Sequence, residues 1–379
     1  MRTYFVTGAT GVVGSSLVPR LLADPTAQLK LLIRARDASE LEARLETLYE
    51  FWGVPREDIA QRSRIEALAG DTTVPRFGLA EDAYRALSAT CTHIVHAAGL
   101  VRMNLPLEEA RSSAVGSARQ VVALARDCPN LVKLDFVSTV GVGGRLQMPI
   151  PERWLTEPRD FHNTYEQAKA ETEDYLREQS LASPLPLTVH RPSMVVGDSR
   201  NGRIIGFQVF YYLCDFLSGR RTYGLYPDFG TARLDIIGCD IVADAIAAAS
   251  VDAQTVGRIL HLCSGPKDAL LISDLKRQVR EAFRRHGLPV SGDRTLPRRA
   301  YAALARTLAQ VAPRDLRKAL AALPIYLDYL ADSQAFDDTA FRSWLGSRGK
   351  ARPAPSTYLP SLLDHYLAKR HGRAGGTGG

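Results

Sequence analysis

The stretch that most constrains this fold lies at the start of the chain, where an apolar run meets a glycine-rich turn and then a helical pattern. Residues 4–6 have the composition of a buried strand, and the apolar spacing over residues 16–22 is typical of a helix. Between them, Gly8 permits a tight turn, Gly11 lets the main chain approach an anion, and Gly14 lets the helix pack on the strand. N–H groups at the helix start would hold a diphosphate. An ordinary strand-to-helix turn is the alternative on this pattern alone.

Strand-like and helix-like segments then alternate along the first half of the chain. The next expected strands are residues 29–33, 65–70, 93–99 and 131–137, and the expected helices are residues 40–52, 82–87, 108–126 and 165–177. The strands are nearly continuous apolar runs, which is typical of a parallel sheet covered by helices on both faces. The pattern therefore predicts an α/β fold of the Rossmann type, with a doubly wound parallel sheet.

Residues at the ends of these strands indicate which dinucleotide binds. Arg34 directly follows the second strand and Arg36 lies two residues later, where cations suit a ribose 2′-phosphate. This favours NADPH over NADH, with ordinary surface arginines as the alternative. Asp71 follows the third strand, where an acid can accept the adenine amino group. Small residues that would let a cofactor lie across the backbone end the fourth strand: Ala97, Ala98 and Gly99.

A tyrosine and a lysine one helical turn apart indicate acid–base chemistry. Tyr165 and Lys169 have the i, i+4 spacing that places them on one helix face. A phenol titrates at about pH 10 in water, and an adjacent ammonium group lowers that pKa. Thr139 follows the fifth strand and would donate a hydrogen bond to a substrate carbonyl, with Ser138 as its rival. A surface helix, and turn chemistry before Gly141, are the structural alternatives.

Six motifs carry a resemblance to a known family: TGATGVVG at 7–14, GD at 70–71, HAAG at 96–99, FVST at 136–139, YEQAK at 165–169 and HRPSMVVGD at 190–198. On these residues the chain resembles the extended short-chain dehydrogenases/reductases. Within them it is most similar to the thioester reductases, meaning fatty acyl-CoA reductases and the terminal reductase domains of carboxylic acid reductases and peptide synthetases. The motifs typical of this group are LLIRARD at 31–37, AGDTTVPRFGL at 69–79, HAAGLVRMNLP at 96–106 and YLPSLLDHYL at 358–367.

The resemblance implies roles for the matched residues. The cofactor would be held by residues around the strand ends: Gly8, Thr10, Gly11, Val12, Gly14, Arg34, Arg36, Asp71, Ala97, Ala98, Gly99, Tyr165, Lys169, Pro192 and Ser193. Thr139 and Tyr165 would polarise the substrate carbonyl, with Tyr165 as the proton donor, and Lys169 would orient the nicotinamide ribose. The chain departs from the family pattern at residues 113–117, which lack the usual asparagine, and at residues 238–240, where Gly-Cys-Asp replaces a valine-aspartate pattern.

Helices are expected to dominate the second half of the chain. Residues 207–217 form a dense aromatic-aliphatic helix, which would be a core helix, a wall for an apolar acyl chain, or both. Residues 234–237 and 258–262 look like strands that return to the main sheet, with a helix at 241–249 between them. Later helices are expected at 273–286, 298–311, 313–331 and 356–370, with a proline-rich linker at 351–355 and a disordered tail at 372–379.

These segments predict two interleaved parts. Residues 1–199 would form an NADP-binding Rossmann domain that residues 233–275 complete. Residues 200–232 and 276–371 would form a smaller, mainly helical substrate-binding region in the C-terminal part. This region would cap the carboxyl ends of the strands, where open α/β sheets bind their ligands.

Charge and composition exclude several classes of function. The net charge is +7, and much of the basic excess lies late in the chain, at Lys276, Arg277, Arg280, Arg284, Arg285, Arg294, Arg298, Arg299, Lys369, Arg370 and Arg373. A solvated basic face explains this best, and attraction for coenzyme A or an acidic acyl carrier protein is the alternative. Nucleic acid is not expected as a partner, because the basic residues are not interleaved with aromatic ones.

No metal site or membrane span is expected either. The five cysteines are scattered without a CxxC pair, and the eight histidines have no metal-binding spacing. The longest apolar stretches are broken by Asp215, Pro324 and Asp328, and no signal peptide precedes the first strand. These features favour reduced thiols and a cytoplasmic location.

The sequence thus predicts an NADPH-dependent reductase that converts an acyl thioester to an aldehyde or an alcohol. A ketone or hydroxyl oxidoreductase, or a nucleotide-sugar epimerase, would use the same machinery, although Arg34 argues against an epimerase that retains NAD. A non-catalytic NADP-binding protein is a further alternative, and the intact Thr139, Tyr165 and Lys169 argue against it.

Overall fold

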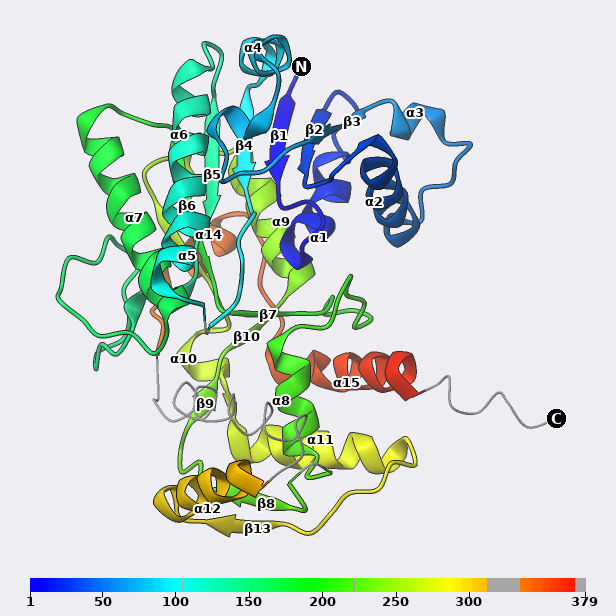
Figure 1. Ribbon diagram of the computed structural model, residues 1–379, viewed down its shortest axis with the longest axis vertical. Coiled ribbons are helices and arrows are strands. Elements are labelled where there is room, and N and C mark those ends of the chain that lie inside the picture. The colour runs from blue at the N-terminus through cyan, green and yellow to red at the C-terminus, as the bar shows by residue number, and fades with distance from the viewer. Residues whose placement is uncertain (104, 221, 312–334, 372–379) are drawn as a thin grey trace.

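The computed structural model describes residues 1–103, 105–220, 222–311 and 335–371 (Figure 1). Its centre is a seven-stranded sheet in the order β11-β6-β5-β4-β1-β2-β3, and every neighbouring pair in it is parallel. The strands are β1 (Thr3–Thr7), β2 (Gln28–Ile33), β3 (Ile65–Ala69), β4 (His93–His96), β5 (Lys133–Val137), β6 (Leu187–Pro192) and β11 (Ile259–Leu262). The strand order reverses between β1 and β4, so the predicted Rossmann-type fold is confirmed.

Helices cover both faces of this sheet. They are α1 (Val12–Leu21), α2 (Ala38–Trp52), α4 (Glu81–Thr90), α6 (Ser117–Asp127), α7 (Thr164–Ala182) and α9 (Cys239–Ser250). Two shorter helices, α3 (Ile59–Arg62) and α5 (Leu107–Arg111), contribute no residue to the cores beneath them. One buried core joins the sheet to α1, α2 and α9 through Leu17, Leu48 and Ile246. A second core joins the other face to α4, α6 and α7 through Leu87, Val121 and Leu176, and Figure 1 shows the two sets of helices on opposite sides.

The helix expected over residues 108–126 is divided into two. A π-helical turn, Ser112–Gly116, separates α5 from α6. Such a turn inserts one extra residue into the helical repeat and is frequent at functional sites. It includes Ser113, which lies in the stretch where the resemblance to the reductases leads us to expect an asparagine.

Figure 1 shows α8 (Val209–Leu217), α11 (Ile272–Arg285) and α15 (Pro355–His371) lying near one another at the end of the molecule away from the main sheet, and a separate core holds them together. In this core the Phe207 and Tyr211 rings lie 4.9 and 5.0 Å from that of Tyr366. Most apolar side chains of α8 are therefore buried in protein, as the core alternative predicted. The remaining elements here are α10 (Gly265–Asp268), α12 (Arg298–Val311), and three strand pairs: β7 (Met194–Val196) with β10 (Ile236–Gly238), β9 (Arg233–Leu234) with β12 (Leu270–Leu271), and β8 (Leu225–Pro227) with β13 (Arg294–Leu296).

The prediction that residues 234–237 return to the main sheet is wrong. Asp235 interrupts this stretch, because its buried carboxylate accepts the Ser264 and Gly265 N–H groups, each at 2.8 Å. The residues on either side pair with different partners, β9 with β12 and β10 with β7. Of the two expected strands, β11 alone joins the seven-stranded sheet.

A helix that the sequence analysis did not expect, α14 (Thr339–Ser347), packs against the main sheet rather than the C-terminal core. Phe341 and Trp344 enter the same core as α1 and α9. The Glu152 carboxylate accepts the N–H groups of Phe341, at 3.1 Å, and His261, at 2.8 Å, and so ties this helix to β11. The helix expected at 313–331 and the tail at 372–379 lie outside the described residues. None of the described helices is long and apolar enough to cross a membrane.

Candidate active site

The glycine-rich turn between β1 and α1 has the geometry that its sequence predicts. Gly8 has a φ of +77°, and a Cβ there would lie 2.5 Å from the main-chain carbon of Ala97, the residue that follows β4. A Cβ on Gly14 would overlap the Gly8 carbonyl oxygen, so the helix packs this closely only because residue 14 is glycine. Gly11 is the N-cap of α1 and, like Thr10, is exposed. The turn therefore presents main-chain N–H groups and the positive end of α1 to an anion.

The basic end of β2 meets the acidic end of β3. Arg34 Nε lies 2.8 Å from Asp71 Oδ2, and the arginine side chain is 67% exposed. Asp71 Oδ1 accepts hydrogen bonds from the Thr73 N–H and hydroxyl, each at 2.8 Å. Partial burial raises the pKa of Asp71, but the hydrogen bonds from Thr73 and the charge of Arg34 outweigh it and hold the pKa below its usual value. Asp71 is therefore a carboxylate at neutral pH.

The side chain of Arg36 is more exposed to solvent than that of Arg34. Its Nε donates to Glu40 Oε2 at 2.8 Å, and its side chain is 87% exposed. The two arginines, the carboxylate of Asp71 and the glycine turn lie at the carboxyl ends of β1, β2 and β3. These residues fit a nicotinamide dinucleotide, because they offer donors for phosphate groups and an acceptor for the adenine amino group.

The end of β4 supplies the small residues and a buried histidine. Ala98 N donates to Thr7 Oγ1 at 3.3 Å, which holds the two strand ends together. His96 lies against Thr7 Oγ1 at 2.8 Å and Ser117 Oγ at 3.4 Å. Burial, reinforced by the charge of Lys169, lowers the pKa of His96 to about 3. His96 is therefore a neutral, hydrogen-bonded packing residue.

The catalytic candidates meet where β5 ends and α7 begins. Asn163 caps α7 by accepting the Glu166 N–H at 2.9 Å, which places Tyr165 in the first helical turn. Thr139 caps the 3-10 turn Val140–Gly143 by accepting the Gly141 N–H at 3.1 Å, and its hydroxyl also hydrogen bonds the Tyr165 phenol. The turn-capping and catalytic readings of Thr139 are therefore compatible.

Lys169 occupies the same face one turn along α7. Its Nζ donates to the Val137 carbonyl oxygen at 3.0 Å and lies 5.5 Å from the Phe136 ring centre. A Cβ on Gly99 would lie 3.8 Å from this nitrogen, so the small end of β4 borders the lysine. The fold thus brings Thr139, Tyr165 and Lys169 together with the end of β4.

The expected lowering of the Tyr165 pKa is not found. Burial raises the pKa of Tyr165 to about 12, and the hydrogen bond from Thr139 offsets this only in part. Burial lowers the pKa of Lys169 to about 8, while the charge of Glu173 acts in the opposite direction. The Lys169 ammonium is bonded to a main-chain carbonyl instead of the phenol, so desolvation dominates at Tyr165. A neutral phenol is the form that can donate a proton.

Ser138, the rival of Thr139, points the other way. It is buried, and its hydroxyl donates to Glu173 Oε1 at 2.5 Å. Pro192 ends β6, and Ser193 follows with its N–H bonded to the Leu262 carbonyl oxygen at 3.0 Å. Both residues are buried at the carboxyl end of the sheet.

A small cavity joins these elements. Its lining includes the predicted residues Ala98, Gly99, Tyr165 and Lys169. Sequence reasoning missed the others: Leu100, Ala110, Ser113, Ala114 and Ala168. Ser113 and Ala114 belong to the π-helical turn, and the absence of the family's asparagine was the available signal for them.

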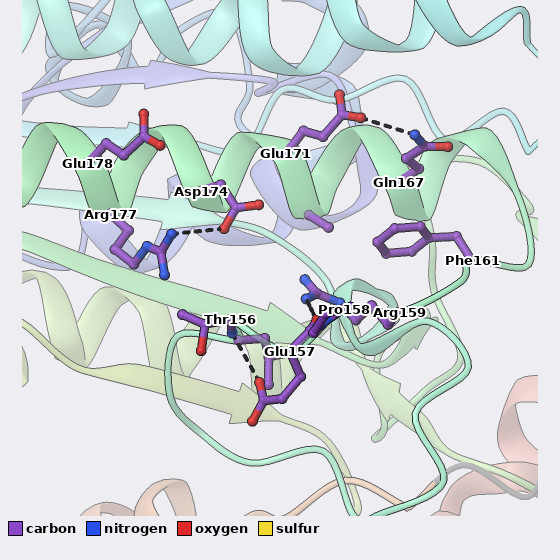
Figure 2. Close-up of a pocket in the computed structure, with 12 residues that line it drawn as sticks. Thr156, Glu157, Pro158, Arg159, Phe161, Gln167, Glu171, Asp174, Arg177 and Glu178 are labelled. Atoms are coloured by element: carbon purple, nitrogen blue, oxygen red, sulfur yellow. Dashed lines mark hydrogen bonds and ion pairs between the residues drawn. The ribbon is translucent and has the colours of Figure 1, made fainter.

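A second, more open pocket lies on the outer face of α7 and is drawn in Figure 2. Its charged lining includes Glu157, Arg159, Glu171 and Asp174, and Gln167 Nε2 donates to Glu171 at 3.1 Å. None of the predicted catalytic or cofactor-binding residues lines it. Within the described residues, no cluster of three or more histidine, cysteine or acidic side chains could hold a metal ion.

The late basic residues are partly neutralised within the fold. Arg280 is buried and donates to Tyr226 Oη at 2.7 Å and to the Ser291 carbonyl oxygen at 2.8 Å. Lys276 lies 2.7 Å from Asp293, and Arg285 lies 3.0 Å from Asp364. Some of the excess charge therefore stabilises the C-terminal core rather than forming an open basic face.

Comparison with known proteins adds independent findings. A family model described as male sterility protein, an NAD-binding family, matches residues 6–246. The isonitrile lipopeptide synthase of Streptomyces coeruleorubidus is 32% identical over 203 residues, covering 52% of this chain and 13% of the synthase. The glycine betaine reductase of Emericella nidulans is 27% identical over 273 residues, covering 69% of this chain and 21% of the reductase.

A solved structure matches over nearly the whole chain. The terminal R domain from the myxalamid PKS-NRPS biosynthetic pathway superposes with a TM-score of 0.80 at 27% identity, covering 99% of this chain and 91% of that domain. The chain thus spans a small part of the curated relatives it matches, and nearly all of one R domain.

Proposed function

The chain belongs to the male sterility protein family, within the extended short-chain dehydrogenases/reductases, and we propose that it reduces an acyl thioester to an aldehyde or alcohol with NADPH. Its membership makes it an oxidoreductase that uses a nicotinamide cofactor. The observation that carries the proposal is the meeting of Thr139, Tyr165 and Lys169 beside the end of β4, at the edge where the glycine turn lies.

The proposed chemistry assigns one task to each of these residues. When bound, the dinucleotide supplies a hydride to the carbonyl carbon of the thioester. Tyr165 donates its phenolic proton to the carbonyl oxygen, and Thr139 donates a hydrogen bond to the same oxygen as charge develops there. Lys169 stabilises the resulting phenolate. The product of this step is a hemithioacetal, whose carbon–sulfur bond breaks to release the aldehyde and the thiol.

The preference for NADPH is also a proposal. Arg34 supports it, because it directly follows β2 and its largely exposed guanidinium can turn to a 2′-phosphate. Arg36 would assist, and Asp71 would accept the adenine amino group. The diphosphate would lie against residues 8–14, and Pro192 and Ser193 would border the nicotinamide.

The thioester substrate rests on the relatives. A lipopeptide synthase and a PKS-NRPS terminal domain are among them, and the motifs in residues 31–37 and 69–79 resemble those of thioester reductases. Coenzyme A or an acyl carrier protein would deliver the acyl group. We also propose that residues 200–232 and 276–371 form the substrate-binding part, except that α14 packs on the sheet.

A panel of thioesters tests this function. Purified protein and NADPH are mixed with acyl-CoA and acyl-carrier-protein thioesters of several chain lengths, and the absorbance of the reduced cofactor is followed. Consumption of NADPH with release of free thiol is expected for at least one class of thioester. Turnover of ketones or alcohols with none of the thioesters would replace the proposal with a simple carbonyl or hydroxyl oxidoreductase.

A further inference from the structure

Glu173 is a buried carboxylate on the catalytic face of α7 that the chemistry above does not use. It follows Lys169 by one turn, as Lys169 follows Tyr165, so the three residues form one stripe along the helix. Only 4% of Glu173 is exposed. Burial of a carboxylate costs desolvation free energy, which nearby charges or hydrogen bonds must compensate. The partners of Glu173 therefore indicate why it is buried here.

Two side chains share this carboxylate. Arg191, on β6, binds it in a bidentate manner, with Nε 2.9 Å from Oε1 and Nη2 2.5 Å from Oε2. Ser138 donates its hydroxyl to Oε1 at 2.5 Å. Glu173 therefore connects α7 with the carboxyl ends of both β5 and β6.

Arg191 is itself held by a full set of acceptors. It is completely buried, and all five of its N–H groups have partners. Besides Glu173, these are the carbonyl oxygens of Pro151 and Arg153, at 3.1 and 3.0 Å, and His261 Nε2 at 3.1 Å. Burial and the charge of Arg191 lower the pKa of His261 to about 3, so this ring is a neutral acceptor. His261 therefore accepts a hydrogen bond from Arg191 without adding a charge to the network.

We propose that Glu173 is a positioning residue for the reduction, holding Thr139 in place through Ser138 and keeping Lys169 charged. The proposal rests on the function assigned to Thr139, Tyr165 and Lys169 above. In this proposal Ser138, the alternative to Thr139 in the sequence analysis, acts on the reaction by holding Thr139 in position.

The first half of the proposal follows from the alternation of side chains along an extended chain. Thr139 has φ and ψ of −158° and 151°, so Ser138 and Thr139 point to opposite sides of the backbone. Ser138 is anchored by Glu173 through its hydroxyl and by the His190 carbonyl oxygen through its N–H, at 2.7 Å. Fixing the buried side chain of Ser138 therefore fixes the direction in which Thr139 projects toward Tyr165.

The second half is electrostatic. Lys169 is buried, and the ionisable groups near it are Tyr165 and Glu173 on α7 and the neutral His96 on β4. Arg191 of β6 is the cation bound to Glu173. Glu173 is the negatively charged one among them, so it is the group that opposes loss of the lysine proton. Without this carboxylate, Lys169 would lose its proton at a lower pH.

Ser138→Ala tests the positioning half with little risk to folding, since it removes one hydroxyl. We expect kcat to fall by about tenfold to a hundredfold, with KM and the NADPH dissociation constant unchanged within about twofold. Ser250→Ala is the matched control. Ser250 is buried like Ser138, its hydroxyl is hydrogen bonded to the side chain of Tyr4, and neither residue belongs to the predicted site. A Ser138→Ala protein that is folded and has wild-type kcat would overturn this half.

Glu173→Gln combined with Arg191→Met tests the electrostatic half, because removing both charges leaves none buried without a partner. We expect the alkaline limb of the kcat profile to move to lower pH by about 0.5–1 unit, because the loss of the Arg191 charge offsets part of the loss of the Glu173 charge. The pH at which NADPH affinity declines, measured by fluorescence, should move with it. Unchanged limbs in a folded double variant would overturn this half, and if that variant does not fold, Glu173→Asp, which retains the charge, must keep the wild-type limb while losing kcat.

All variants are compared on whichever carbonyl compound the wild-type protein reduces fastest. The comparison therefore remains valid if the thioester panel fails and a ketone is the substrate. Loss of the proposed function would appear in the wild type itself, whereas failure of this inference would appear as variants that match the wild type.

Discussion

Arg34 and Asp71 form an ion pair across the ends of β2 and β3, with Nε 2.8 Å from Oδ2. The two residues that the sequence assigns to the 2′-phosphate and to adenine are therefore each other's partners in this structure. Exposed pairs of this kind contribute about 0–1 kcal/mol, whereas a bidentate contact with phosphate is among the strong charge-assisted interactions. Arg34 can consequently leave Asp71 for a phosphate at little cost.

Arg34→Ala should weaken NADPH binding about 10- to 100-fold and leave NADH binding within about twofold, because only NADPH carries a 2′-phosphate on its adenosine ribose. Fluorescence titration with each cofactor measures the difference. Arg36→Ala is the matched control, and its smaller effect is expected from its greater exposure and its bond to Glu40. Equal losses for NADH and NADPH in Arg34→Ala would remove the 2′-phosphate assignment.

Gly14→Ala and Gly11→Ala should separate folding from cofactor binding. The Gly14 variant places a methyl group on the Gly8 carbonyl oxygen, and we expect it to lower the free energy of unfolding by about 1–3 kcal/mol. At Gly11 the nearest atom to an added Cβ is 3.3 Å away, so the main effect should be weaker NADPH binding. Urea unfolding and NADPH titration measure the two effects.

Gly346→Ala provides the control for this pair. Gly346 lies in α14 with open space around its Cβ position, and alanine there should add up to about 1 kcal/mol of stability. If Gly14→Ala were as stable as Gly346→Ala, the close packing of α1 on β1 would not depend on glycine.

Tyr165→Phe should reduce kcat by about 10²- to 10⁴-fold, the usual contribution of a general acid, because phenylalanine has no proton to give. NADPH affinity should change little, since Lys169 keeps its bond to Val137. Tyr175→Phe, at a half-buried tyrosine of the same helix that does not line the cavity at Tyr165 and Lys169, should retain activity. Substantial turnover by Tyr165→Phe would assign the proton to another group.

His96 should contribute to acid denaturation. Its pKa is about 3 in the folded protein and about 6.5 when unfolded, so the unfolded state binds the proton more readily between these values. Above pH 6.5, His96 causes no loss in the free energy of unfolding. Between about pH 6.5 and 3, its contribution lowers this free energy by about 1.4 kcal/mol for each unit that the pH falls. The pH dependence of urea unfolding should therefore be less steep in His96→Gln.

The difference in slope between the two proteins is the decisive quantity in that experiment. Glu152, whose pKa burial raises to about 7, contributes a slope of opposite sign over part of the same range. It contributes equally to wild type and variant. Identical slopes for both proteins would mean that His96 is not a buried neutral ring.

Local patterns predicted most of the sheet. Each of the first five expected strands overlaps an observed one, since a buried parallel strand needs an apolar run that is visible in the sequence. The division of residues 108–126 by a π-helical turn was not predicted, because apolar spacing alone does not reveal one inserted residue. The break at Asp235 was missed because its cause is a pair of N–H groups about thirty residues away.

Some features of the candidate active site were likewise predictable from the sequence, and others depended on the tertiary structure. The sequence by itself determined the glycine turn and the i, i+4 spacing of Tyr165 and Lys169, because these depend on neighbours along the chain. Only the tertiary structure decided that Ser138 faces Glu173 while Thr139 faces Tyr165, that burial rather than Lys169 governs the Tyr165 pKa, and that Arg34 is paired with Asp71. These outcomes depend on desolvation and on contacts between distant segments, and neither quantity exists until the chain has folded.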